Sequence, residues 1–169
     1  TSLTSLLIGN SIQTIGANTF RNISGLPAIQ LPDSLEVINN NAFSEAESLA
    51  SIEFGNSLTT IGSDIFQNTA LTTIALPNSV TTIAGSAFRD SNLSSITIPD
   101  SVTSIGSRAF ENTKLTSVNI PDSVTEIGYR AFANIATLTE LTLGESVHRI
   151  RSEAFAQTSI ESLTIPDSV

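Results

Sequence analysis

Seven phenylalanines recur along this chain at a nearly constant spacing of 22 or 23 residues. They are Phe20, Phe43, Phe66, Phe88, Phe110, Phe132 and Phe155, and only Phe54 falls outside the series. A fixed period in the twenties is typical of a solenoid, in which equivalent coils stack on one another. It argues against a globule with a single closed core.

The repeat unit is clearest in residues 93–110, which read LSSITIPDSVTSIGSRAF, and in residues 115–132, which read LTSVNIPDSVTEIGYRAF. Seven complete copies and the first part of an eighth make about seven and a half repeats of 22 to 23 residues. Six positions are apolar in every complete copy, and in residues 93–110 they are Leu93, Ile96, Ile98, Val102, Ile105 and Phe110. Burial of six side chains does not offset the conformational entropy that one coil loses on folding. We therefore expect stability to come from contacts between coils.

Each segment of residues 93–110 predicts a local structure. Apolar residues alternate in residues 93–98, several of them β-branched, which predicts a short strand with one buried face. Pro99 has no amide hydrogen and ends the strand, and the Asp and Ser that follow favour a turn. Gly106 is expected to take a positive φ. Residues 107–112 are expected to form one helical turn that points Phe110 inward.

Together these segments predict a right-handed solenoid. A parallel β-sheet with one strand per coil should cover one face, and short helical or 3-10 turns and loops should form the other. The strands should centre near Ile74, Ile96, Val118 and Leu141. The rings of Phe88, Phe110 and Phe132 should be buried and stacked along the axis. The same register places Arg130 beside Glu153, so we expect these two side chains to meet.

The repeat resembles the BspA-like, or Treponema-type, leucine-rich repeats, whose pattern is LxxIxIPxSVTxIGxxAF followed by a short variable link. The resemblance covers essentially the whole chain. It implies a leucine-rich-repeat solenoid. It also implies a surface or secreted protein, because members of this family are mostly found there and several are implicated in adhesion.

The chain departs from this pattern at the position three residues after each phenylalanine, where family members often have Cys. Here the position holds Ile23, Ala46, Thr69, Ser91, Thr113, Ile135 and Thr158. Ile or Ala accompanies the longer links, and Thr or Ser the shorter ones. We therefore expect two forms of link, one that buries this side chain and one that makes a hydroxyl-bonded corner.

The composition limits the domain organisation and the classes of partner. No stretch departs from the repeat, so residues 1–169 are expected to be a single leucine-rich-repeat domain. The chain begins and stops within a repeat, and we expect it to be part of a longer protein whose capping units lie elsewhere. Sixteen acidic residues against seven Lys and Arg give a net charge of −9, which argues against nucleic acid. No hydrophobic run is long enough for membrane insertion.

No motif predicts a catalytic, cofactor-binding or metal site. Cysteine is absent and His148 is the only histidine, which we expect at the surface. Its neighbours Arg149 and Arg151 are expected to pair with Glu145 and Glu153. Asp100 and Asp122 should stack one strand spacing apart, and we interpret them as turn-forming rather than cation-binding.

Several asparagines also fall at repeat positions. Asn22, Asn68, Asn112 and Asn134 lie two residues after a phenylalanine, and they are interpreted as corners that satisfy buried backbone. Asn22 and Asn92 match the N-glycosylation pattern, but so few matches are expected by chance in a chain this rich in Asn, Ser and Thr.

The predicted recognition surface is the exposed side of the strands. Its central residues are Ser51, Glu53, Thr73, Ala75, Ser95, Thr97, Ser117, Asn119, Glu140 and Thr142. These side chains are small, rich in hydroxyls and almost uncharged, and they lack the Tyr, Trp or Arg anchors of interface hot spots.

Two functions are consistent with these features. The first is a non-catalytic, adhesin-like module at the cell surface or outside the cell, which binds a protein or glycan on another cell or in the matrix. The alternative is a spacer or filament-forming rod that associates end to end through its termini. Ice binding by the Ser and Thr rows is disfavoured, because Gln30, Glu53 and Glu140 interrupt them.

Overall fold

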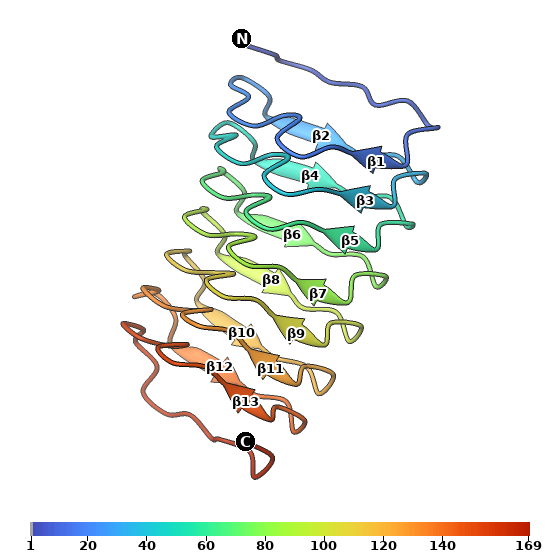
Figure 1. The fold of residues 1–169 in the computed structure, drawn as a ribbon. Helices are drawn as coiled ribbons and strands as arrows, with labels where there is room; N and C mark the ends of the chain where they lie inside the picture. The colour runs from blue at the N-terminus through green and yellow to red at the C-terminus, as the bar shows by residue number, and fades with distance from the viewer. Residues whose placement is uncertain (1) are drawn as a thin grey trace.

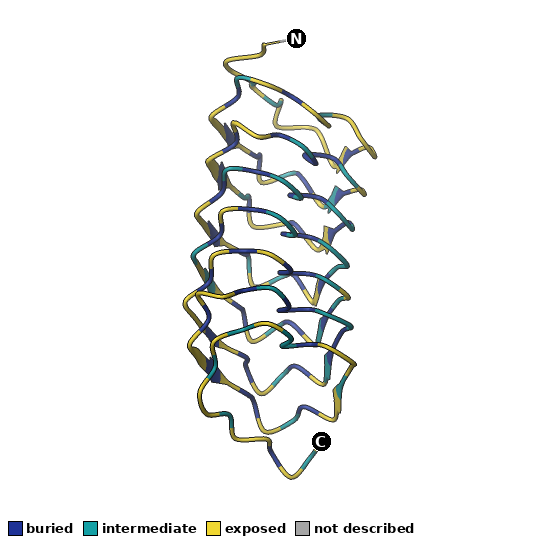
Figure 2. Ribbon diagram, turned by 90° about the vertical axis from the view of Figure 1, so that its left-hand side faces the viewer, coloured by how far each residue is buried: buried dark blue, intermediate teal, exposed yellow. Residues whose placement is uncertain are grey.

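The computed structural model describes residues 2–169, and in it the chain winds into a stack of similar coils with its two termini at opposite ends (Figure 1). Each coil between residues 26 and 155 contains a three-residue strand, a tight turn, a two-residue strand and a run of hydrogen-bonded turns. Buried and exposed residues recur at the same places from coil to coil (Figure 2). The predicted solenoid is confirmed.

The three-residue strands lie where the repeat predicts them. They are β2 (Ala28–Gln30), β4 (Ser51–Glu53), β6 (Thr73–Ala75), β8 (Ser95–Thr97), β10 (Ser117–Asn119) and β12 (Glu140–Thr142). They pair in parallel as β2-β4, β6-β8 and β10-β12, with Ile74 opposite Ile96 and Val118 opposite Leu141, so the predicted single sheet is divided into three two-stranded sheets. The predicted strand centres are therefore confirmed. The corresponding segments of the outermost coils, residues 5–7 and 162–164, are not strands.

Each coil also contains a second strand that the sequence analysis did not predict. These are β1 (Thr14–Ile15), β3 (Val37–Ile38), β5 (Thr60–Ile61), β7 (Thr82–Ile83), β9 (Ser104–Ile105), β11 (Glu126–Ile127) and β13 (Arg149–Ile150). They form parallel sheets in the orders β1-β3-β5 and β7-β9-β11-β13. Stacking the first set of strands brings these segments within hydrogen-bonding distance as well. The prediction of one strand per coil was therefore wrong.

The predicted helical turns were also wrong, since residues 2–169 contain no helix. Arg108 and Asn112 both have φ of 59°, in the left-handed region, which breaks a helical path within each turn. The chain instead makes successive tight turns. The amide of Phe110 donates to the carbonyl of Ala131 in the next coil at 2.8 Å, and the amides of Arg108 and Asn112 donate across in the same way.

Gly106 serves close packing, whereas a positive φ was predicted for it; Gly25 is the only glycine with positive φ in the described chain. A Cβ on Gly106 would lie 2.6 Å from the backbone nitrogen of Gly85. A Cβ on Gly128 would likewise lie 2.5 Å from the backbone nitrogen of Ser107. Gly106 and Gly128 therefore allow successive backbones to approach closely at this corner.

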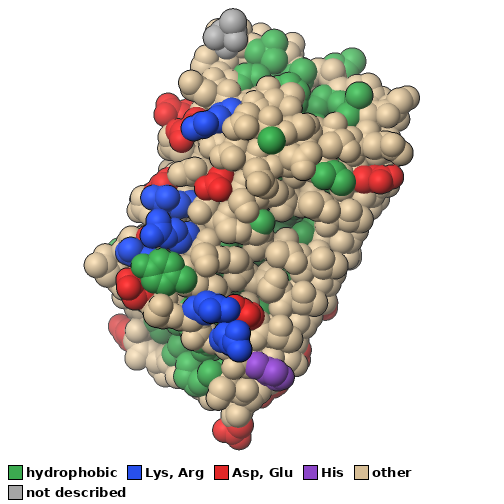
Figure 3. Space-filling model, in the orientation of Figure 1, with side chains coloured by type: hydrophobic (Ala, Val, Ile, Leu, Met, Phe, Trp, Pro, Cys, Tyr) green, Lys and Arg blue, Asp and Glu red, His purple; other side chains and the backbone are tan. Residues whose placement is uncertain are grey.

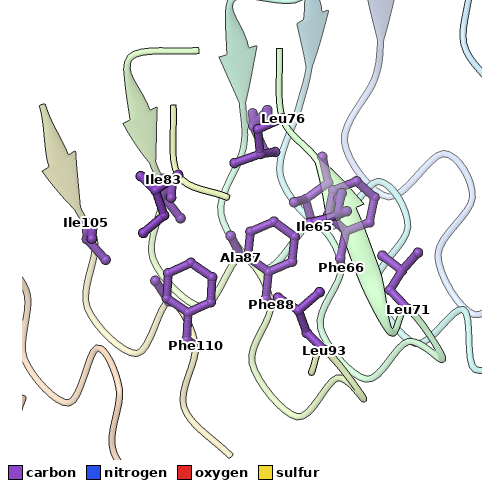
Figure 4. Close-up of a cluster of buried hydrophobic side chains, with 14 of the residues drawn as sticks. Ile65, Phe66, Leu71, Leu76, Ile83, Ala87, Phe88, Leu93, Ile105 and Phe110 are labelled. Carbon is purple, nitrogen blue, oxygen red and sulfur yellow. The ribbon is translucent and has the colours of Figure 1, made fainter. Parts of the chain in front are cut away.

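The phenylalanines form a continuous column through the core. Ring centroids are 5.4 Å apart between Phe88 and Phe110 and 5.0 Å apart between Phe110 and Phe132, with the planes within 14° of parallel. Figure 4 shows Phe66, Phe88 and Phe110 one after another, with leucine and isoleucine side chains around them. The predicted stack of buried rings is confirmed.

The two predicted forms of link are confirmed only in part, because the shorter links also bury the side chain three residues after the phenylalanine, and the buried hydroxyl of Ser91 has no hydrogen-bond partner among residues 2–169. In the longer links, the side chains at this position are buried: Ile23, Ala46 and Ile135. After the shorter links, the hydroxyl of Thr113 donates to the carbonyl of Phe110 at 2.9 Å, and Thr69 and Thr158 make the equivalent bond. Thr113 and Thr69 are themselves buried, so the hydroxyl corner satisfies a polar group inside the core.

Candidate functional site

The structure exposes the whole of the predicted strand face. The ten residues of this face, from Ser51 to Thr142, occupy the first and third positions of β4, β6, β8, β10 and β12, and all are exposed. The middle residue of each strand points into the core. Parallel register aligns the exposed side chains in two rows along the axis, with Thr73 opposite Ser95 and Ser117 opposite Glu140.

This face offers hydroxyls and amides but few charges. Glu53 and Glu140 are its only ionic groups, and Gln30 extends it in register with Glu53. A shallow hollow at its N-terminal end is lined by Thr4, Ser5, Leu6, Pro27, Ala28, Ile29, Gln30, Ser51 and Glu53. No aromatic side chain lies on these strands. The face can therefore form many weak hydrogen bonds but has no single anchor.

A second polar feature lies on the edge formed by the turns, around the buried carboxylate of Glu111. Its side chain is 7% exposed, and Nε of Arg89, Arg108 and Arg130 lies 3.4, 3.8 and 3.2 Å from its oxygens. Arg130 also contacts Glu153 at 3.7 Å, as predicted. Glu111 was not predicted from the sequence, although Arg89 holds the same repeat position one coil earlier, and this opposite charge could have indicated the pair.

Tyr129 completes this edge. The guanidinium carbons of Arg108 and Arg130 lie 5.6 and 6.0 Å from the centre of its ring, within the range of cation–π attraction. Partial burial lowers the pKa of Arg130, but its hydrogen bond with Tyr129 and the carboxylates of Glu111 and Glu153 outweigh this and raise it. Figure 3 shows Lys and Arg side chains gathered along the edge of the turns, with acidic side chains among them.

Arg149 and Arg151 pair with Glu126, so the predicted pairing with Glu145 and Glu153 was wrong. Nε of Arg151 lies 2.6 Å from one oxygen of Glu126, and Nη1 of Arg149 lies 3.9 Å from the other. Parallel register explains this, because β11 places Glu126 directly opposite Arg149 of β13. His148 is exposed, as predicted.

The acidic turns hold adjacent coils together. A carboxylate oxygen of Asp122 accepts from the amide of Glu145 at 2.8 Å, and Asp33 accepts from the amide of Asn56 at 3.0 Å. In the described part of the chain, no three His, Cys, Asp or Glu residues are grouped to hold a metal ion.

The asparagine corners differ from their interpretation as backbone-satisfying residues. Asn68 and Asn112 have φ of 55° and 59°, a conformation that Asn tolerates better than most residues. Their side-chain amides donate to carboxylates of the preceding coil, Asn68 to Glu45 and Asn112 to Asp90, both at 2.8 Å. These corners therefore link side chains of adjacent coils.

The family of the chain follows from its sequence and fold together. The sequence matches the model of the BspA type leucine rich repeat region over residues 1–114 and 59–169. The chain belongs to this family. No curated protein matches it by sequence. Over residues 2–169 there is no helix with the length and apolar character needed to cross a membrane.

Solved structures show the same fold. A leucine-rich repeat protein of T. pallidum is 28% identical, with a TM-score of 0.73 over 82% of this chain and 66% of its own. A leucine-rich cell surface protein of Faecalibacterium prausnitzii is 26% identical, with a TM-score of 0.58 over 95% of this chain and 47% of its own. A leucine-rich repeat protein of Eubacterium ventriosum is 20% identical, with a TM-score of 0.63 over 95% of this chain and 53% of its own. This chain thus spans about half to two thirds of these proteins.

Proposed function

We propose that this chain is a non-catalytic recognition module of a cell-surface or secreted protein, and that it binds a protein or glycan partner across the strand face. The observation that carries the proposal is the pair of exposed rows along β4, β6, β8, β10 and β12, which present small polar groups at the strand spacing. Membership of the BspA-type family supports it, as does similarity to a protein described as a cell surface protein.

The geometry favours a partner that contacts several coils at once. Each coil contributes only two small exposed side chains to the strand face, and neither is an aromatic or Arg anchor. Specific interfaces need roughly 800 Å² from each partner, more than one such coil provides. We therefore expect affinity to rise with the number of intact coils.

Lysine substitutions on this face test the proposal. Ser95, Thr97, Ser117 and Asn119 are replaced together by Lys, and binding is measured on a glycan array and on immobilised matrix proteins. The variant should fold normally, because all four side chains are exposed, and should lose the protein or glycan partner that the wild type binds through the strand face.

A matched control carries the same added charge on the other strand face. It replaces Thr81, Thr82, Thr103 and Thr125, which are also exposed, by Lys. This control should keep the interactions of the wild type. Loss of binding in the control and retention in the strand-face variant would contradict the proposal.

End-to-end association is the second candidate function. It is favoured by core-position side chains left exposed on the outermost coils, with Ile12 43% and Ile165 49% exposed. Association of these surfaces predicts a sedimentation coefficient that rises with protein concentration. Replacing Ile12 and Ile165 by Glu should abolish that rise, whereas a concentration-independent monomer in the wild type would contradict this function.

A further inference from the structure

A hollow beside Tyr129 is separate from the strand face and is not used by the proposed function. It lies where β9 and β11 meet the turns, and it is lined by Ser104, Ile105, Gly106, Ser107, Glu126, Gly128, Tyr129 and Arg151. It spans successive coils on the side of the two-residue strands.

The floor of the hollow is bare backbone. Gly106 and Gly128 occupy the same repeat position in successive coils, and close approach of the backbones leaves neither room for a side chain. Arg151 holds this position in the next coil, since Ile150 pairs with Ile127. A trough that is open over two glycines is therefore closed at one end by a guanidinium.

The walls of the hollow differ in chemistry. One wall carries Tyr129, the only tyrosine of the chain, whose ring is flanked by Arg108 and Arg130. Glu126 also lines the hollow, and its carboxylate contacts Nε of Arg151 at 2.6 Å. An aromatic ring thus shares one hollow with a fixed carboxylate and a fixed guanidinium.

We propose that this hollow binds a neutral pyranose unit of a glycan, with the sugar ring packed on Tyr129 and its hydroxyls bonded to Glu126 and Arg151. A pyranose has an apolar face that suits the amphipathic tyrosine ring. Its neighbouring hydroxyls both donate and accept, which matches a carboxylate beside a guanidinium and allows charge-assisted hydrogen bonds on each side.

The charges around the hollow favour a neutral sugar over an acidic one. Arg151 and Arg149 both already face Glu126, and Arg130 and Arg108 face Glu111. An acidic sugar would also approach a chain whose net charge is −9. The inference extends the glycan arm of the proposed function to a second surface and does not require the strand face.

Tyr129 provides a direct readout, because the chain contains no tryptophan and no other tyrosine. The probes are neutral oligosaccharides of glucose, galactose, mannose and N-acetylglucosamine, added up to millimolar concentration to the whole chain. At least one should change the fluorescence of Tyr129 saturably. Ligand-observed NMR should report the same binding independently of the fluorophore.

Variants taken from the repeat itself keep the fold. Tyr129→Ser introduces the residue found at Ser107, and Arg151→Gly the residue found at Gly128. By NMR, Tyr129→Ser should abolish binding, and Arg151→Gly should weaken it about tenfold or more, the effect of losing a hydrogen bond to a charged group. The strand-face lysine variant should bind the sugar as the wild type does.

Three results would overturn the inference. They are no response to any neutral oligosaccharide, unchanged binding by Tyr129→Ser, and tighter binding of a uronic acid oligosaccharide than of every neutral one. The strand-face variant separates this inference from the proposed function. If the strand-face variant loses its protein or glycan partner but keeps the neutral sugar, the proposed function and the sugar site are both supported. If the variant keeps its partners on the array and on matrix proteins, only the strand-face proposal fails.

Discussion

The column of phenylalanines is the most direct place to perturb the solenoid, and we predict that Phe110→Ala lowers its stability by several kcal/mol. Phe110 is 0% exposed, and its ring lies between Phe88 at 5.4 Å and Phe132 at 5.0 Å. Truncation of a buried Phe to Ala costs about 3–5 kcal/mol, and the two lost ring contacts place this case at the upper end.

The surrounding structure cannot collapse into the cavity. The amide of Phe110 is held at 2.8 Å from the carbonyl of Ala131, and its neighbours donate to the next coil in the same way. For a domain of this length, each kcal/mol lowers the melting temperature by about 2–4 °C, so the expected loss is about 6–20 °C.

Thermal unfolding followed by circular dichroism measures this loss, with Phe155→Ala as the matched control. Phe155 is only partly buried and has one ring neighbour, Phe132 at 5.9 Å. The control should therefore lose less than half as much. A melting temperature of Phe110→Ala within a degree or two of the wild type, or equal losses in the two variants, would refute the reasoning.

Three further substitutions test other contacts between coils. Gly128→Ala should cost about 1–3 kcal/mol in chemical denaturation because its Cβ meets backbone at 2.5 Å, whereas Gly85→Ala, with its nearest atom at 3.4 Å, should be near neutral; equal costs would contradict the packing argument. Glu111→Gln should destabilise by about 1–3 kcal/mol, since three arginines then face no buried carboxylate, and an unchanged midpoint of chemical denaturation would contradict this. Thr113→Val should cost about 1 kcal/mol by removing the 2.9 Å bond to Phe110 from the core, and no measurable change in denaturation midpoint would contradict it.

The parts of the fold that could be predicted are those determined by residues that recur in every repeat. The spacing of the phenylalanines determines the stack, and the alternation around Ile96 and Val118 determines the strand centres. The left-handed backbone of Arg108 could not be read in this way, because Arg gives no sign of a positive φ and only the hydrogen bonds to the next coil favour it. The second strand likewise depends on a coil spacing set elsewhere.

The charged contacts were harder to predict, because they depend on which side chains face each other once the coils are stacked. Arg130 with Glu153 follows from a shared repeat position. Arg151 with Glu126 joins different repeat positions, which only the path of the backbone brings within 2.6 Å. The hollow beside Tyr129 was missed for a related reason, since Gly106 was interpreted as a turn residue rather than as the floor of a trough.

The placement of the termini at opposite ends of the stack has a mechanical consequence (Figure 1). A pulling force applied through the two ends loads the coils in series, and each coil is held by short ladders to its neighbours alone. Releasing one coil of 22 residues frees about 75 Å of extended chain and removes about 4.8 Å of stack. A single-molecule extension trace should therefore advance in steps of about 70 Å. The 22-residue spacing of the phenylalanines thus determines how far the molecule lengthens at each step under tension.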